Sequence, residues 1–178
     1  MTVWDTTGLA PEDQPRFEYV NREQIPNELK EVFDSIVGSQ RGVGTLSNGA
    51  LPGPFNGWMY TDPEMARALD SIGMAIRLNT TNVPKAMKEV AICVIGAHFR
   101  SNVEFWAHSR IALAAGVRQD VLDSIYNGEK PSFIDSEEER RQKAAYNMAG
   151  EYLRNYRVSD ETYPVSYTHL RAHETPLH

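Results

Sequence analysis

Side chains able to do acid–base chemistry are concentrated in residues 88–116, KEVAICVIGAHFRSNVEFWAHSRIALAAG. They are Glu89, His98, Ser101, Glu104 and His108. A histidine flanked by two carboxylates has a raised pKa and a fixed tautomer, and both properties suit proton transfer near neutral pH. The stretch therefore predicts a proton-transfer site.

The helices expected around these residues decide whether the residues can meet. Glu89 lies toward the middle of one apolar helix, and Glu104 begins the next helix, one turn before His108. If the two helices form an antiparallel hairpin, Glu89 returns toward the face that carries Glu104 and His108. The first backbone amides of the second helix could then hold a substrate carboxylate or a developing oxyanion.

A purely structural interpretation of the same residues is equally open. Ser101-x-x-Glu104 is a capping-box pattern, in which each side chain satisfies the other residue's backbone N–H. Glu104 and His108 would then be an ordinary i,i+4 pair, and Glu89 an exposed residue beside neighbouring lysines. On this interpretation none of these residues is catalytic.

Cys93 is the only cysteine of the chain. It lies in an apolar run, where burial raises the pKa of a thiol, and it has no second cysteine to pair with. We therefore interpret Cys93 as a core residue without redox function.

Hydrophobic periodicity predicts an all-α fold of about six helices with a central helix hairpin. No strand pattern of alternating β-branched residues is evident. We expect an irregular arm over residues 1–22 and a long loop, rich in glycine and proline and of a kind that is often functional, over residues 42–58. The helices are expected within residues 21–42, 61–78, 83–99, 102–116, 118–128 and 135–156.

Local signals mark several helix ends. Asp62 is expected to cap a helix whose first residue is Pro63, and Gly116 to end another helix in the left-handed conformation. Ser136-x-x-Glu139 is a second capping-box pattern. The helix over residues 61–78 carries an apolar stripe of Met65, Leu69, Ile72 and Ile76.

Composition restricts the class of protein. The chain has 178 residues, of which 41% are hydrophobic and 24% charged, as expected of a globular domain with its own core. A net charge of −6 provides no electrostatic footprint for nucleic acid, and an anionic substrate would need local cations. The lone cysteine, the lack of a long apolar run and the lack of a signal-peptide pattern lead us to expect a cytoplasmic protein with neither nucleic-acid nor membrane partners.

The last residues, SYTHLRAHETPLH, differ from the rest of the chain. They hold three of the five histidines and show neither a helical stripe nor a capping residue. They resemble the translated read-through of a sequencing adapter, so we treat residues 166–178 as an aberrant tail that follows a single domain over residues 1–165. A metal site built from these histidines is the alternative.

The spacing of the proton-transfer candidates resembles that of the carboxymuconolactone decarboxylase / alkyl hydroperoxidase D-like family. Redox members of this family carry a glutamate and, after an interval, Cys-x-x-Cys-x-x-x-His. Counted back from His108, the cysteine positions fall on Glu104 and Ser101, and Glu89 precedes them by the family's interval. GPFNGWMYTDPEMARALDSIGMAIRL and HSRIALAAGV also look like the decarboxylase-like branch, so the resemblance covers roughly residues 45–150.

The resemblance implies an all-helical domain that assembles as a homotrimer or homohexamer, with its active site near the helix hairpin. It implies that Glu89 and His108 are proton-relay residues, and that Ser101 and Glu104 replace the redox cysteines. Because neither replacement supplies a thiolate, peroxide reduction is disfavoured. The activity implied is acid–base, lyase-type chemistry, without cofactor or metal, on a small carboxylated or lactone substrate of aromatic-compound breakdown.

Four further residues are candidates for substrate binding. Arg100 and Arg110 could anchor carboxylates, Trp106 could line an apolar pocket, and His98 could join the site; each could equally be a solvated or packed helix residue. Three other functions stay open. They are a peroxidase like the cysteine-bearing relatives, a non-catalytic helical oligomer that binds a small molecule, and a metal-bound form held by Glu and His.

Overall fold

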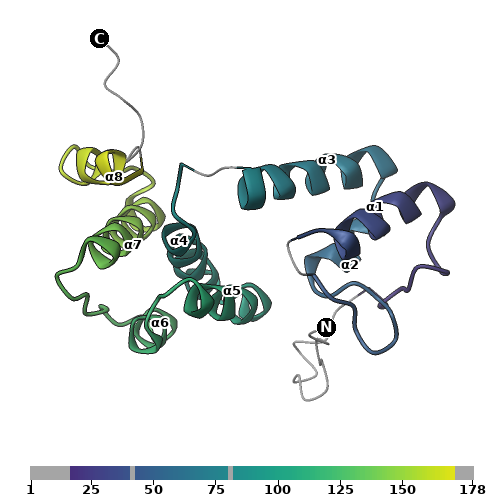
Figure 1. The fold of residues 1–178 in the computed structure, drawn as a ribbon, viewed down its shortest axis with the longest axis horizontal. Helices are drawn as coiled ribbons and strands as arrows, with labels where there is room; N and C mark the ends of the chain where they lie inside the picture. Colours follow the sequence, from purple (N-terminus) through teal and green to yellow (C-terminus); the bar gives the residue numbers. More distant parts are fainter. Residues whose placement is uncertain (1–16, 41–42, 80–81, 171–178) are drawn as a thin grey trace, which may run out of the picture. The chain divides into compact units, whose positions relative to one another are not determined.

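The computed structural model describes residues 17–40, 43–79 and 82–170, and most of these residues lie in helices (Figure 1). These residues form eight α-helices and a π-helical segment and no strand, so the predicted all-α class is confirmed. Within these ranges no helix has the length and apolar character that crossing a bilayer requires. The elements are α1 (Asn27–Gly38), α2 (Pro54–Trp58), α3 (Pro63–Met74), η2 (Ala75–Asn79), α4 (Lys85–His98), α5 (Asn102–Ala114), α6 (Gln119–Tyr126), α7 (Glu137–Asn155) and α8 (Thr162–Leu170).

Two compact units, Met1–Thr80 and Thr81–His178, divide the chain. The first unit contains α1, α2, α3 and η2, and the second contains α4 to α8. The sequence leads us to expect one domain over residues 1–165, and the division falls inside that span. Each unit has a hydrophobic cluster of its own.

One face of α1 forms the centre of the first unit's core. Its buried residues recur at helical spacing, as an amphipathic helix requires. They are Leu29, Val32, Phe33 and Ile36. Buried residues from the rest of the unit pack in the same cluster, namely Ile25, Leu51, Met59 and Ala66.

The helix predicted over residues 21–42 is shorter in the structure. α1 begins at Asn27, directly after Pro26, and ends at Gly38. Proline has no backbone N–H and disfavours helical backbone at the residue before it, so the helix starts after Pro26.

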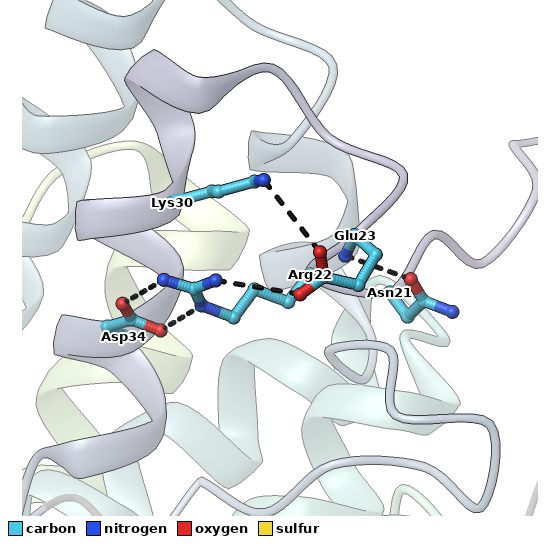
Figure 2. Close-up of polar contacts among 5 residues, drawn as sticks. All are labelled: Asn21, Arg22, Glu23, Lys30 and Asp34. Carbon is cyan, nitrogen blue, oxygen red and sulfur yellow. Dashed lines mark hydrogen bonds and ion pairs between the residues drawn. The ribbon is translucent and has the colours of Figure 1, made fainter.

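Charged side chains hold residues 21–23 against α1 (Figure 2). Arg22 donates to both carboxylate oxygens of Asp34, at 2.6 and 2.7 Å, and this hydrogen bonding lowers the pKa of Asp34. Glu23 lies 3.6 Å from Arg22 and 3.9 Å from Lys30. Because these groups are exposed to solvent, they orient the segment more than they stabilise the fold.

The loop expected over residues 42–58 is partly helical and partly buried. α2 occupies its last residues. Leu46, Ala50 and Leu51 are buried, so the remainder of the segment packs into the first unit. Apolar side chains at intervals along this glycine-rich segment explain its burial. Removing apolar surface from water lowers the free energy whether or not the backbone is helical.

α3 begins as predicted but buries a different face. Asp62 accepts a hydrogen bond from the N–H of Glu64 at 2.8 Å, and Pro63 occupies the first position. The apolar stripe is exposed over much of its length, to 55, 56 and 51% for Met65, Ile72 and Ile76.

A small residue and a hydrogen-bonded carboxylate form the buried face of α3. Ala66 and Asp70 are buried, and the hydroxyl of Ser35 on α1 donates to Asp70 at 2.7 Å. The contact between α1 and α3 therefore depends on a polar pair that hydrophobic periodicity does not reveal.

The second unit is built around α4, which contacts α5, α6 and α7 and lies between α5 and α7 (Figure 1). Neighbours on several sides explain why α4 is apolar around most of its circumference. α8 packs on α7. The core residues include Met87, Val90, Cys93, Val94, Ala112, Val121 and Leu122.

Helix ends in the second unit follow the predicted signals in part. Gly116 has a φ of 92° and follows α5 in the left-handed conformation, as predicted. Ser136 caps α7 by accepting a hydrogen bond from the N–H of Glu139 at 3.2 Å. The reciprocal half of the predicted capping box does not form, because the Glu139 carboxylate accepts from the N–H of Ile134 at 2.7 Å and faces Arg118.

The predicted tail, residues 166–178, is helical in its first part. α8 extends to Leu170, and the N–H of Thr162 donates to the hydroxyl of Ser159 at 3.2 Å. The segment lacks a local helical pattern, so packing on α7 accounts for its helix as far as Leu170. Residues 171–178 lie outside the described residues, and the read-through origin and the histidine metal site stay predictions.

Asn56 ties the residues that precede α1 to the first unit. Its side chain, 2% exposed, accepts from the N–H of Val20 at 3.1 Å and donates to the carbonyl of Glu18 at 3.0 Å. We predict that Asn56→Ala lowers the free energy of unfolding by about 1–3 kcal/mol, because both backbone groups lose this partner. Urea denaturation followed by circular dichroism measures the change. Asn147→Ala, at an exposed position of α7, is the control, and an equal loss in both variants would contradict the prediction.

Candidate functional site

α4 and α5 form the helix hairpin that the sequence predicts. Phe99, Arg100 and Ser101 connect them. Arg100 adopts the left-handed conformation, with a φ of 52°. Its N–H donates to the carbonyl of Ala97, and the N–H of Ser101 donates to the carbonyl of Gly96, the two hydrogen bonds of a Schellman cap. The chain thus reverses in a short, fully hydrogen-bonded turn.

Gly96 allows α5 to start directly against α4. A Cβ at this position would lie 3.3 Å from the backbone nitrogen of Phe105, which is tighter than ordinary packing allows. The next contact along the hairpin joins Glu89, earlier in α4, to His108, later in α5, so the helices run antiparallel. The second turn of α4 therefore lies beside the second turn of α5.

His108 contacts both carboxylates of the predicted site. Its Nδ1 lies 2.7 Å from Oε2 of Glu89, and its Nε2 lies 3.3 Å from Oε2 of Glu104. Glu89 projects from α4, whereas Glu104 and His108 lie one turn apart on the same face of α5. The structure thus brings together three side chains that come from two helices. We call Glu89, His108 and Glu104 the trio.

Exposure increases along the trio. The side chains of Glu89, His108 and Glu104 are 1, 12 and 39% exposed. The exposed position that the structural alternative expects for Glu89 is therefore wrong, whereas the i,i+4 contact that it expects between Glu104 and His108 is present. A buried carboxylate must be hydrogen-bonded or paired with a charge, and His108 is such a partner. Glu104 connects the histidine with solvent.

The contacts of His108 place a carboxylate oxygen beside each ring nitrogen. A neutral imidazole can donate from one nitrogen only, whereas an imidazolium donates from both. Glu89 beside Nδ1 fixes the ring and retains a proton on that nitrogen. Nε2, next to the more exposed Glu104, is then the atom at which a proton can be gained or lost. This arrangement is suited to general acid–base chemistry.

The trio does not form a metal centre. Glu89 and Glu104 contact opposite ring nitrogens of His108, so their oxygens do not converge on one point. Within the described ranges no group of three or more His, Cys, Asp or Glu side chains is arranged to hold a metal ion.

Ser101 is the N-cap residue of α5, but its hydroxyl makes no capping hydrogen bond. The predicted capping box with Glu104 therefore does not form, and the Glu104 carboxylate faces His108 instead. Ser101 precedes His108 by about two turns, so both lie on one face of α5. Ser101 therefore stands at the positive end of the helix dipole.

Two of the predicted substrate-binding residues lie apart from the trio. His98 follows Glu89 by about two and a half turns, which places it on the opposite face of α4. Arg100 is exposed in the turn between the helices. The structure therefore does not bring His98 or Arg100 to the three acid–base residues.

The other two lie on the far side of α5. Trp106 and Arg110 each stand two positions from His108, and such positions do not share a helix face. The Arg110 guanidinium carbon lies 4.9 Å from the centre of the Trp106 ring, a cation–π contact. Phe105 packs against the core and against Tyr126. A role of these residues in substrate binding stays a prediction.

Sequence reasoning missed two residues that shape the hairpin. Gly96 permits the close approach of the helices, and its signal was a glycine inside an apolar helical pattern. Arg100 adopts a left-handed conformation that arginine seldom takes, so its residue type carried no signal.

Cys93 lies in the core, as predicted. It is completely buried among the apolar residues of α4 and its neighbours. Burial, and to a smaller extent the nearby negative charge of Glu89, raises the pKa of its thiol to about 12. The thiol is therefore protonated at neutral pH and is a poor nucleophile.

Comparison with known proteins identifies no relative: no protein-family model, no curated protein and no solved structure matches the chain. The function must therefore be argued from the trio and its surroundings.

We predict that iodoacetamide leaves Cys93 unmodified in the folded protein at pH 8, because burial excludes the reagent and keeps the thiol protonated. In the urea-unfolded chain the thiol pKa returns to about 8.5, and alkylation should be fast. Mass spectrometry measures both. Rapid alkylation of the native chain would contradict this prediction.

The pKa of Cys93 also links stability to pH. Since the folded state holds the thiol proton more tightly than the unfolded state does, Cys93 should reduce the free energy of unfolding as the pH rises above about 9.

Proposed function

We propose that the chain is a cofactor-free acid–base enzyme of the lyase type, belonging to the decarboxylase-like branch of the carboxymuconolactone decarboxylase / alkyl hydroperoxidase D-like family. The observation that carries the proposal is His108, held between a buried and a partly exposed carboxylate. The proposed substrate is a small carboxylated or lactone compound of aromatic-compound breakdown.

In the proposed reaction Nε2 of His108 transfers the proton. When a substrate carboxylate leaves as carbon dioxide, the bonding electrons pass to the neighbouring carbon and on to an adjacent carbonyl oxygen as an enolate. The imidazolium then donates the Nε2 proton to carbon, and the carbonyl re-forms. Glu104 exchanges the next proton with solvent, while Glu89 stabilises the charge on the ring throughout.

The start of α5 provides a site for the negative charge that develops. Its first backbone amides and the Ser101 hydroxyl lie at the positive end of a helix dipole. An enolate oxygen held there would be stabilised by groups that are already oriented before the reaction, which is the most effective form of electrostatic catalysis.

A peroxidase function is disfavoured by the state of the sulfur. Ser101 and Glu104 stand where the redox relatives carry cysteines, and Cys93 is buried and protonated. A non-catalytic helical binder is the remaining alternative. Its signature is a rise in melting temperature on addition of the substrate without turnover.

Turnover of carboxymuconolactone and related lactones tests the proposed activity. His108→Gln retains an amide that can donate to Glu89, but it cannot transfer a proton, so we predict a fall in kcat of about 100-fold or more. Glu104→Gln should cause a smaller fall, because the partly exposed position of Glu104 allows water to replace it in proton exchange.

Glu138→Gln, at an exposed position of α7, is the matched control and should retain full turnover. Circular dichroism establishes that each variant is folded. Unchanged turnover in both His108→Gln and Glu104→Gln would rule out the assigned roles. Binding without turnover by the unaltered chain would favour the non-catalytic alternative.

We also propose that the chain assembles as a homotrimer or homohexamer in the cytoplasm. The exposed stripe formed by Met65 and Ile72 of α3 and Ile76 of η2 supports assembly, because exposed apolar surface is typical of protein interfaces. A single cysteine suits a reducing compartment.

We predict that Ile72→Glu shifts the assembly toward monomers, because it places a charge in the centre of the exposed stripe. Sedimentation velocity measures the distribution of species. Ser71→Glu adds the same charge at the neighbouring exposed position, off the stripe, and should leave the assembly intact. An unaltered chain that sediments as a monomer would contradict the proposed assembly.

A further inference from the structure

A cleft of about 260 Å³ lies in the second unit, lined by α4, α6 and α7. His98 is among its lining residues, and His98 lies on the face of α4 opposite Glu89. None of the trio lines it, so the cleft is separate from the candidate active site. Its polar lining residues are His98, Tyr126, Glu129, Tyr146 and Arg154.

Two glycines limit the side-chain volume in the cleft. Gly128 follows α6 with a φ of 71°, a left-handed conformation that favours glycine. A Cβ on Gly150 would lie 3.1 Å from Nη1 of Arg154. The bare backbone at Gly150 therefore allows the Arg154 side chain to lie back along α7. A guanidinium group is thus placed against the wall of the cleft.

Aromatic rings form another part of the lining. The Tyr126 ring packs on Phe105 with its centre 4.9 Å away, and the Tyr146 ring packs on Phe133 at 6.0 Å. These contacts hold the tyrosines without covering them completely. Aliphatic lining is supplied by Val94, Ala97, Ile125 and Leu153.

We propose that this cleft binds a small aromatic carboxylate with a single negative charge. A planar guanidinium binds a carboxylate through two parallel hydrogen bonds, and the tyrosines with the aliphatic side chains accept a ring. The volume is below the roughly 300–1,000 Å³ of sites for drug-sized ligands, so the ligand has one ring. Glu129 disfavours a second negative charge.

The affinity depends on Arg154. The chain as a whole is negatively charged and does not attract anions. Arg154 also interacts with Glu151 one turn away, and its charge contributes to the lowered pKa of that carboxyl. The guanidinium is therefore partly neutralised, and a ligand of this size should bind with a dissociation constant of about 1 mM.

Titration of the full chain with benzoate, followed by saturation-transfer NMR of the ligand, tests the proposal. Benzoate should bind saturably, and Arg154→Gln should weaken binding about tenfold or more. Arg157→Gln, at an exposed position just beyond α7, should leave the affinity unchanged. Benzyl alcohol has the same ring without the charge and should bind far more weakly, as should the dianion terephthalate.

Two further variants separate the possible explanations. Gly150→Ala retains the charge but displaces the guanidinium, so it should also weaken binding. His108→Gln should bind benzoate as the unaltered chain does, because the cleft is separate from the trio. The proposal is overturned by non-saturable binding, by equal affinity for benzyl alcohol, by unchanged binding in Arg154→Gln, or by loss of binding in His108→Gln. These measurements report binding only, so they do not depend on whether the chain has the proposed catalytic activity.

Discussion

A carboxylate buried as deeply as that of Glu89 needs a partner that can donate a hydrogen bond or carry a positive charge. His108 is such a partner, with its Nδ1 2.7 Å from Oε2 of Glu89. The turn between α4 and α5 and the close packing of these two helices make this contact possible. The left-handed turn at Arg100 reverses the chain, and Gly96 allows the second helix to approach the first. Without this approach the imidazole could not reach a residue in the middle of α4. The polar contact therefore constrains the helix packing together with the apolar core.

α4 presents different chemistry on its opposite faces. One face carries Glu89 and Cys93, packed toward α5 and the core, and the other carries His98, which lines the cleft shared with α6 and α7. A helix with neighbours on several sides is often only a structural centre. Here the neighbours create two chemically distinct environments, an acid–base trio on one side and a cleft with a guanidinium group and aromatic rings on the other. The Phe105–Tyr126 contact joins α5, which carries His108, to the lining of the cleft.

The sequence was informative where local physical chemistry decides the outcome. Periodicity predicted the helices of the core, and residue spacing predicted that Glu89, Glu104 and His108 could meet. The sequence was misleading where tertiary contacts decide the structure. The hydrogen bond between Ser35 and Asp70 selects the buried face of α3. α8 has no helical pattern of its own and packs on α7. The cleft could not be predicted, because its lining comes from three helices and depends on how Arg154 lies against Gly150.

The position of Cys93 limits how this hairpin could change its chemistry. The thiol lies one turn from Glu89 on the same helix, and both burial and that negative charge hold it in its protonated form. Burial is the larger of these two causes, and the carboxylate that pairs with His108 adds to it. A reactive thiol on this hairpin would instead need a cysteine at the start of α5, where helix amides favour a thiolate. Glu89 therefore links two properties of the hairpin, because its buried carboxylate pairs with His108 and also helps to keep the thiol of Cys93 protonated.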